Sequence, residues 1–443
     1  MKIVVVAHNM EVGGTQVNAI ELSAGLRDTY GHDVVLFGTP GPMVKVAEEK
    51  GMRFISAPHR RRIHEDSGDR NDYKPSPAMM RALREVVRSE RPDLVHTWEA
   101  WQCVDAYYAV HLMERVPMIA SDMNGGNSLL RFLPKTILTT FGTPELVDRA
   151  RAAGRRRVEL LVPPVDVHAN APGIVDPKPF REHYSIKAND VLLVTASRLT
   201  VTLKGESLRR TIDAVRVLGR DLPLCLVLVG DGNARNELER LAAETNAELG
   251  RTAVILTGEL LDPRAAYAAA DIVVGMGGSA LRGMAFGKPV IIAGEQGFSW
   301  PLTPETAESF YYRGIYGIGD GSPSNARLIG DIRALAESGD KLPALGAFSR
   351  QFVLNHFALE IVCSQVEKFC RAAVAERRRS FVAAADGVRT ATLLWFGGFA
   401  PYSIRRLVKD REANRVRLSM QSQYHGPGTE TSTGRTLMLG EKQ

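Results

Sequence analysis

Short, almost continuously apolar segments alternate with helical patterns along most of this chain of 443 residues. The apolar segments are residues 3–7, 34–37, 94–96 and 118–120, and then 191–196, 224–229, 254–257, 272–274 and 289–293. Strands buried on both faces show such apolar runs, and parallel strands are joined by helices. The alternation therefore predicts an α/β protein with two Rossmann-like domains, each built on a parallel sheet covered by helices.

Two adjacent prolines, Pro163 and Pro164, mark the expected boundary between these domains, because proline cannot continue a helix. We expect a first domain over residues 1–164 and a second over residues 165–348. Apolar side chains at helical spacing, such as Phe352, Val362 and Phe369, predict one long helix over residues 349–375 that packs back on the first domain. Residues 376–443 form a basic tail, and we expect disorder after residue 420, where Ser, Thr, Gly and Gln dominate.

The net charge of +6 lies entirely in that tail, which holds twelve Lys and Arg against six Asp and Glu. The rest of the chain is neutral, and this argues against a nucleic-acid-binding protein. The apolar stretch 393–402 precedes several arginines. Two interpretations stay open for the tail, peripheral contact with a membrane or a helix packed on the body.

The four cysteines have neither the spacing of a zinc site nor that of a disulfide framework. The N-terminal apolar run is too short for a signal peptide, and no run is long enough to span a membrane. We therefore expect a cytoplasmic protein, peripheral at the inner membrane face if the tail binds lipid, with no metal site.

A glycine-rich turn joins strand to helix within residues 273–290. Gly275 and Gly277 allow the backbone to approach a ligand, and the helix that opens near Ser279 offers unpaired N–H groups. This pattern indicates a phosphate site, with an ordinary strand-to-helix turn as the alternative. Gly13 and Gly14 form a second such loop after the first strand, with the same two interpretations.

Two cations, Arg198 and Lys204, follow the strand at residues 191–196. At the carboxyl end of a parallel strand they are placed to hold two linked phosphates, although they could also be solvated surface charges. Gly230 and the pair Gly258 and Glu259 end the next two strands. They are expected to line the same crevice or simply to form turns.

Taken together, these segments resemble the retaining GT-B glycosyltransferases of family 4. The resemblance covers residues 1 to about 300 in matching order, through GGTQVNAIELSAGL, GHDVVLF, RPDLVH, SRLTVTLKGESL, LVLVGDGNARNELERL, VILTGELLDPRAAYAAADIVVGMG and SALRGMAFGKPVI. It implies a first domain that binds the acceptor and a second that binds a nucleotide sugar across a cleft, without metal or cofactor.

The resemblance also assigns roles to individual residues. Arg198 and Lys204 would hold the donor diphosphate, and Gly13 and Gly14 would face it from the other domain. The nucleobase would meet Gly258, Glu259 and Leu261, and the phosphates and sugar would lie along Gly275, Gly277 and Ser279. His96 matches a strand-end histidine of the family on the acceptor side, or is a structural histidine.

Three positions depart from the family pattern. Val274 and Arg282 stand where two glutamates are usual, and Met123 stands where a histidine is common. Glu295 could accept hydrogen bonds from the sugar hydroxyls in their place, pair with Arg282, or be an ordinary loop carboxylate.

The resemblance therefore implies a retaining glycosyltransferase that moves a sugar from a nucleotide-diphosphate donor to an acceptor hydroxyl. A non-catalytic nucleotide-sugar-binding or regulatory protein and a GT-B sugar-nucleotide epimerase are the alternatives. The arginine-rich segment 58–77 predicts a loop near the acceptor.

Overall fold

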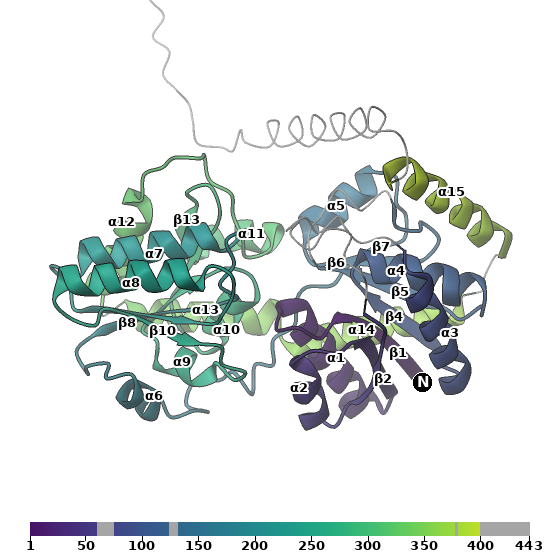
Figure 1. Ribbon diagram of the computed structural model, residues 1–443, viewed down its shortest axis with the longest axis horizontal. Coiled ribbons are helices and arrows are strands. Elements are labelled where there is room, and N and C mark those ends of the chain that lie inside the picture. The colour runs from purple at the N-terminus through teal and green to yellow at the C-terminus, as the bar shows by residue number, and fades with distance from the viewer. Residues whose placement is uncertain (60–74, 124–131, 340, 377–379, 399–443) are drawn as a thin grey trace, which may run out of the picture. The chain divides into compact units, whose positions relative to one another are not determined.

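The computed structural model describes residues 1–59, 75–123, 132–339, 341–376 and 380–398 (Figure 1). Contacts divide the chain into a compact unit of residues 1–387 and a second unit of residues 388–443. Both sheets lie in the first unit. The boundary expected at residue 164 falls between the last strand of one sheet and the first strand of the other. The division into two domains at that point stays a prediction. Most of the predicted 58–77 loop and all residues after 420 lie outside the described residues.

The first sheet has seven parallel strands in the order β3-β2-β1-β4-β5-β6-β7. The strands are β1 (Lys2–Asn9), β2 (Asp33–Thr39), β3 (Arg53–Ser56), β4 (Leu94–Trp98), β5 (Met118–Asp122), β6 (Leu138–Phe141) and β7 (Val158–Leu160). The strand order reverses between β1 and β4, which are neighbours in the sheet. Ligands of open α/β sheets bind at such a reversal, beyond the carboxyl ends of the strands.

Both faces of this sheet are covered by helices. Ile3 and Val5 of β1 belong to the apolar cluster of α1, whereas Val4 and Val6 belong to the cluster of α3 and α4. This alternation explains why β1 reads as a continuous apolar run. The helices of this part are α1 (Gly14–Tyr30), α2 (Met43–Glu49), α3 (Pro77–Glu90), α4 (Ala100–Ala106), the π-helical η2 (Tyr107–Leu112) and α5 (Pro144–Ala152).

The second sheet has the strand order β10-β9-β8-β11-β12-β13. Only β13 is antiparallel to its neighbour. Its strands are β8 (Val191–Ala196), β9 (Leu224–Val229), β10 (Val254–Gly258), β11 (Ile272–Gly275), β12 (Val290–Ala293) and β13 (Ser299–Pro301). The five parallel strands are those expected from the sequence, and the α/β fold with two Rossmann-like sheets is confirmed.

Helices again cover both faces of the second sheet, and Figure 1 shows α7 and α8 side by side over one of them. The helices are α6 (Lys178–His183), α7 (Gly205–Leu218), α8 (Arg235–Leu249), α9 (Arg264–Ala269), α10 (Gly278–Ala285), α11 (Pro304–Arg313) and α12 (Ala326–Glu337). One apolar cluster contains residues of β1 and α1 together with residues of β8, α10 and β12. The two sheets therefore share part of their core.

The long helix expected over residues 349–375 is wrong, because the chain forms α13 (Leu342–His356) and α14 (Leu359–Ala375) instead. Ala358 between them is extended, with φ −58° and ψ 135°. Hydrogen bonds with the backbone of Val165 replace those of a continuous helix at this point. The Val165 N–H donates to Phe357 O at 2.8 Å, and Val165 O accepts from the Leu359 N–H at 2.9 Å.

The break directs the two helices to different sheets. Helix α13 packs on α10, and α14 packs on α1. A buried pair fixes α14, since Glu367 Oε2 lies 2.5 Å from His32 Nε2. The chain thus returns to the first sheet after residue 357, through α14 and not through α13.

The last described helix is α15 (Ser380–Gly398). Its residues up to Gly387 belong to the first compact unit and the later ones to the second, and the boundary expected at residue 376 stays a prediction. None of the helices in the described ranges has both the length and the apolar character that crossing a membrane requires.

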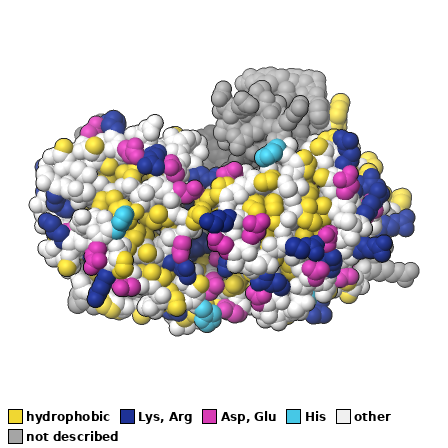
Figure 2. All heavy atoms as spheres, turned by 60° about the horizontal axis from the view of Figure 1, so that its bottom comes forward, with side chains coloured by type: hydrophobic (Ala, Val, Ile, Leu, Met, Phe, Trp, Pro, Cys, Tyr) yellow, Lys and Arg dark blue, Asp and Glu magenta, His cyan; other side chains and the backbone are white. Residues whose placement is uncertain are grey.

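Lysine and arginine side chains alternate with acidic ones over the face shown in Figure 2. This mixture agrees with the neutral charge balance of the chain before residue 376.

Candidate functional site

The carboxyl ends of the parallel strands β8 to β12 share one edge of the second sheet. Apart from Arg282, which lies within α10, the residues of this sheet predicted to bind the donor follow these strand ends. They are Arg198 and Lys204 after β8, Gly230 after β9, Gly258 at the end of β10 with Glu259 and Leu261 after it, Gly275 at the end of β11 with Gly277 and Ser279 after it, and Glu295 after β12. Glu259 and Leu261 are exposed there. The structure therefore brings the predicted donor set to a single sheet edge.

Two turns at this edge require glycine. Gly230 has φ +139°, and a Cβ added there would lie 2.0 Å from Ser197 O. Gly277 has φ +58° and precedes the first residue of α10, with open space where a Cβ would point. Any other residue would strain the backbone at both positions, and at Gly230 its Cβ would also clash with the backbone of Ser197.

Arg198 reaches from this edge to the loop between β1 and α1. Its Nη2 donates a hydrogen bond to Val12 O. A Cβ added at Gly13 would lie 3.3 Å from the same nitrogen, and Gly14, the first residue of α1, has open space at its Cβ position. The guanidinium and Gly13 are therefore neighbours, although they come from parts of the chain with different sheets.

Lys204 is the N-cap residue of α7, and its Nζ donates to Met276 O at 3.5 Å in the glycine-rich turn. Burial lowers the pKa of Lys204 to about 8, while the nearby Glu295 carboxylate partly opposes this. Lys204 thus faces the turn between β11 and α10, whereas Arg198 faces the loop between β1 and α1. A partly desolvated ammonium interacts strongly with an anion that replaces its lost hydration.

Glu295 accepts a hydrogen bond from the Tyr316 hydroxyl through Oε2. The alternative pairing with Arg282 is not formed, because Arg282 Nη2 lies 3.7 Å from Glu21 Oε1 of α1. Burial raises the pKa of Glu21, and the Arg282 charge opposes that rise.

Val274 lies inside β11 and is 1% exposed, so its register directs the side chain into the core.

His96 does not lie at a strand end as predicted, because β4 continues to Trp98. The imidazole is 2% exposed, and its Nε2 lies 2.8 Å from Ser121 Oγ on the adjacent strand. Burial lowers the pKa of His96 to about 3, so the ring is neutral. In this structure His96 is an interior histidine without access to an acceptor.

The carboxyl end of β4 instead carries Glu99, which sequence reasoning missed. Its backbone is strained for a residue with a side chain, with φ +76° and ψ 152°. The carboxylate is 8% exposed, and Oε1 accepts a hydrogen bond of 2.9 Å from Thr15 Oγ1 in the first turn of α1. Such backbone conformations concentrate at functional sites. A carboxylate directly after the apolar strand was the available sequence signal.

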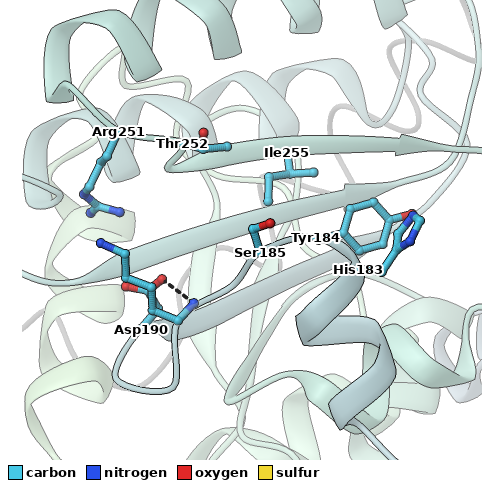
Figure 3. Close-up of a pocket in the computed structure, with 8 residues that line it drawn as sticks. His183, Tyr184, Ser185, Asp190, Arg251, Thr252 and Ile255 are labelled. Atoms are coloured by element: carbon cyan, nitrogen blue, oxygen red, sulfur yellow. Dashed lines mark hydrogen bonds between the residues drawn. The ribbon is translucent and has the colours of Figure 1, made fainter.

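A hollow of about 430 Å³ lies elsewhere, at the amino ends of β8 and β10 (Figure 3). Its lining includes His183, Asp190, Arg251 and Ile255. The donor set occupies the carboxyl edge of the same sheet, so this hollow is separate from it. Within the described ranges, no group of three or more His, Cys, Asp or Glu side chains has an arrangement suited to a metal ion.

Two sequence families match this chain. The model described as Glycosyltransferase Family 4 matches residues 12–122, and that described as Glycosyl transferases group 1 matches residues 190–304. Together they span just over half of the chain. Among curated proteins, no sequence match was found.

Several solved structures share the fold. The HepE protein of Anabaena in complex with UDP has a TM-score of 0.62 at 16% identity, covering 84% of this chain and 100% of its own. A glycosyltransferase from Rickettsia africae has a TM-score of 0.63 at 16% identity, covering 85% and 99%. A putative UDP-N-acetylglucosamine 2-epimerase from Listeria monocytogenes has a TM-score of 0.57 at 14% identity, covering 86% and 98%.

Proposed function

We propose, from the premise that this chain belongs to the GT-B glycosyltransferases of the family 4 type, that it transfers a sugar from a nucleoside-diphosphate donor to an acceptor hydroxyl with retention of configuration. The observation that carries this proposal is the placement of Arg198 and Lys204. Both cations lie at the carboxyl edge of the second sheet and face glycine-rich backbone.

A diphosphate fits this arrangement by charge. The Arg198 guanidinium is planar and carries several N–H donors. The Lys204 ammonium is a compact charge, and burial has removed part of its hydration. The start of α10 at Gly278 adds backbone N–H groups and the positive end of a helix dipole. That HepE was solved with UDP supports a nucleoside diphosphate as the ligand.

Glu295 is our candidate for the sugar-binding carboxylate. It follows β12, and its charge acts on Lys204, so it is close to the proposed phosphate site. The Tyr316 hydroxyl orients one of its oxygens. It would replace the family glutamates that Val274 and Arg282 do not supply.

The proposed transfer needs little covalent chemistry from the protein. The bond between the anomeric carbon and the diphosphate oxygen breaks, the acceptor oxygen bonds to that carbon on the same face, and the acceptor proton passes to the departing diphosphate. Arg198 and Lys204 would stabilise the charge that develops on the leaving group. In this proposal the two cations do what a metal ion does in other transferases, so no metal is needed. The proposal also places the reaction in the cytoplasm.

On the acceptor side we propose Glu99 in place of His96. The Glu99 carboxylate lies next to the first turn of α1, the helix whose Gly13 neighbours Arg198. A carboxylate there can accept a hydrogen bond from the acceptor hydroxyl and orient it toward the donor.

The experiment is a screen of purified protein with nucleotide sugars, read by mass spectrometry for released nucleoside diphosphate and for altered sugar. We expect release of the diphosphate that increases with a suitable acceptor and is lost in Arg198→Ala. Arg220→Ala is the matched control, because Arg220 is an exposed arginine two residues after the end of α7 and away from the proposed site.

Other outcomes separate the alternatives. Conversion of the donor to an epimer without acceptor would favour the epimerase, whose fold is shared by the Listeria protein. Tight donor binding with neither hydrolysis nor transfer would favour a non-catalytic binding protein.

A further inference from the structure

Helix α15 turns polar groups toward the body of the protein. Asp386 is 7% exposed, and its Oδ2 accepts hydrogen bonds from the backbone N–H groups of Lys135 at 2.6 Å and Thr136 at 2.8 Å. The Tyr107 and Tyr108 hydroxyls donate to the carbonyls of Ala383 and Gly387 at 2.8 and 2.7 Å. These contacts fix which face of the first part of the helix is inward.

Large apolar side chains lie on the exposed surface of the same helix. Phe381 is 85% exposed, Val388 69% and Trp395 54%. Residues seven apart in a helix lie on nearly the same face, so the three form one stripe. Val382 and Phe396, adjacent to its ends, are also exposed. An ordinary surface helix has the opposite arrangement, with apolar groups inward, so this stripe indicates an interaction surface.

Basic residues accompany the stripe in the sequence. Three arginines at 377–379 precede α15, and Arg389 lies within it. Six further Lys and Arg residues fall within 399–417, against two acidic ones. Since residues before 376 are neutral in sum, the net positive charge of the chain falls in the sequence of this helix and the segments on either side of it.

We propose that α15 binds the surface of an anionic lipid bilayer, with Phe381, Val388 and Trp395 at the boundary between headgroups and acyl chains. Aromatic side chains favour that boundary, and clustered Lys and Arg bind anionic headgroups. A second copy of this chain fits less well, because its own α15 would bring equal positive charge to the contact. The proposal does not depend on the glycosyltransferase function.

The test is sedimentation of the full chain with vesicles of phosphatidylcholine alone or mixed with phosphatidylglycerol. We expect binding to the mixed vesicles, weakened by high salt and at least about tenfold lower in the double variant Phe381→Ser, Trp395→Ser. Ile174→Ser is the matched control, because Ile174 is an apolar side chain outside α15 that is 55% exposed. Circular dichroism checks that each variant is folded.

A second measurement does not depend on the serine variants. Brominated lipids should quench the fluorescence of the wild-type chain bound to mixed vesicles, and Trp395→Phe should remove that quenching. Three results would overturn the proposal: no vesicle binding, equal binding by the double variant, or equal binding to neutral vesicles. Self-association that is lost in the double variant, without vesicle binding, would assign the stripe to a second copy instead.

Discussion

Replacing Lys204 by methionine removes the ammonium and keeps most of the side-chain volume. If Lys204 holds a diphosphate oxygen, the change removes one hydrogen bond between charged groups, which contributes about 1.5 to 3 kcal/mol. Affinity for a nucleoside diphosphate should therefore fall roughly 10- to 150-fold. Isothermal titration calorimetry at pH 7 measures it, with Lys187→Met as the control, because Lys187 is exposed at the amino edge of the same sheet.

The pH dependence of binding gives an independent check. Since burial places the pKa of Lys204 at about 8, the wild-type cation is lost as the pH rises through that value. Affinity should be about tenfold weaker at pH 9 than at pH 7. Lys204→Arg should remove this dependence, because arginine stays protonated.

Lys204→Met should lower the affinity for the diphosphate but raise the stability of the folded chain. The pKa of Lys204 is lower in the folded than in the unfolded chain, so the unfolded chain binds more protons between the two values. The free energy of unfolding should then rise with pH over that window in the wild type. Lys204→Met should be more stable than the wild type at pH 7. A folded methionine variant with unchanged diphosphate affinity would refute the reasoning.

Three further variants test the rest of the site. Glu295→Gln should lower kcat/KM about 10- to 100-fold while the affinity for the free nucleoside diphosphate is unchanged, because only the sugar contact is lost; equal losses for both would contradict this role. Glu99→Gly should fold, because glycine tolerates the positive φ at this position, and should raise the acceptor KM through loss of the carboxylate; a variant as active as the wild type removes Glu99 from the mechanism. Arg282→Ala leaves Glu21 buried without its partner, so denaturant titration should show a loss of about 1 to 3 kcal/mol at pH 8. Because burial raises the pKa of Glu21, that loss should shrink as the pH falls and the carboxylate is protonated, and a loss independent of pH would argue against the pair.

Local signals predicted much of the fold. Thr143 and Thr303, each followed by proline, predict helix starts, and α5 and α11 begin at Pro144 and Pro304. Thr143 accepts a hydrogen bond from Leu146 N–H at 3.2 Å. Such caps act within one helical turn, so the sequence alone carries the information.

Elements that depend on distant contacts were missed. β7 and β13 have three residues each, too few for a periodic pattern. The break at Ala358 follows from backbone hydrogen bonds to Val165, which lies nearly two hundred residues earlier. No local pattern encodes such a partner.

The candidate site likewise combines features that local sequence predicts with features that depend on distant contacts. Parallel topology alone gathers Arg198, Lys204 and Glu295 at one edge, so strand ends predicted their grouping. The pairing of Arg282 with Glu21 and the strained backbone at Glu99 arise from packing between elements far apart in the chain. His96 was misplaced because β4 continues for two residues, Thr97 and Trp98, beyond the expected end of the strand.

A crystal structure of the protein with a bound nucleoside diphosphate tests the central claim most directly. The account predicts both phosphates at the carboxyl edge of the second sheet, within hydrogen-bond distance of the Arg198 guanidinium and Lys204 Nζ and beside the start of α10. A diphosphate bound elsewhere, with either cation turned away from it, would contradict the account.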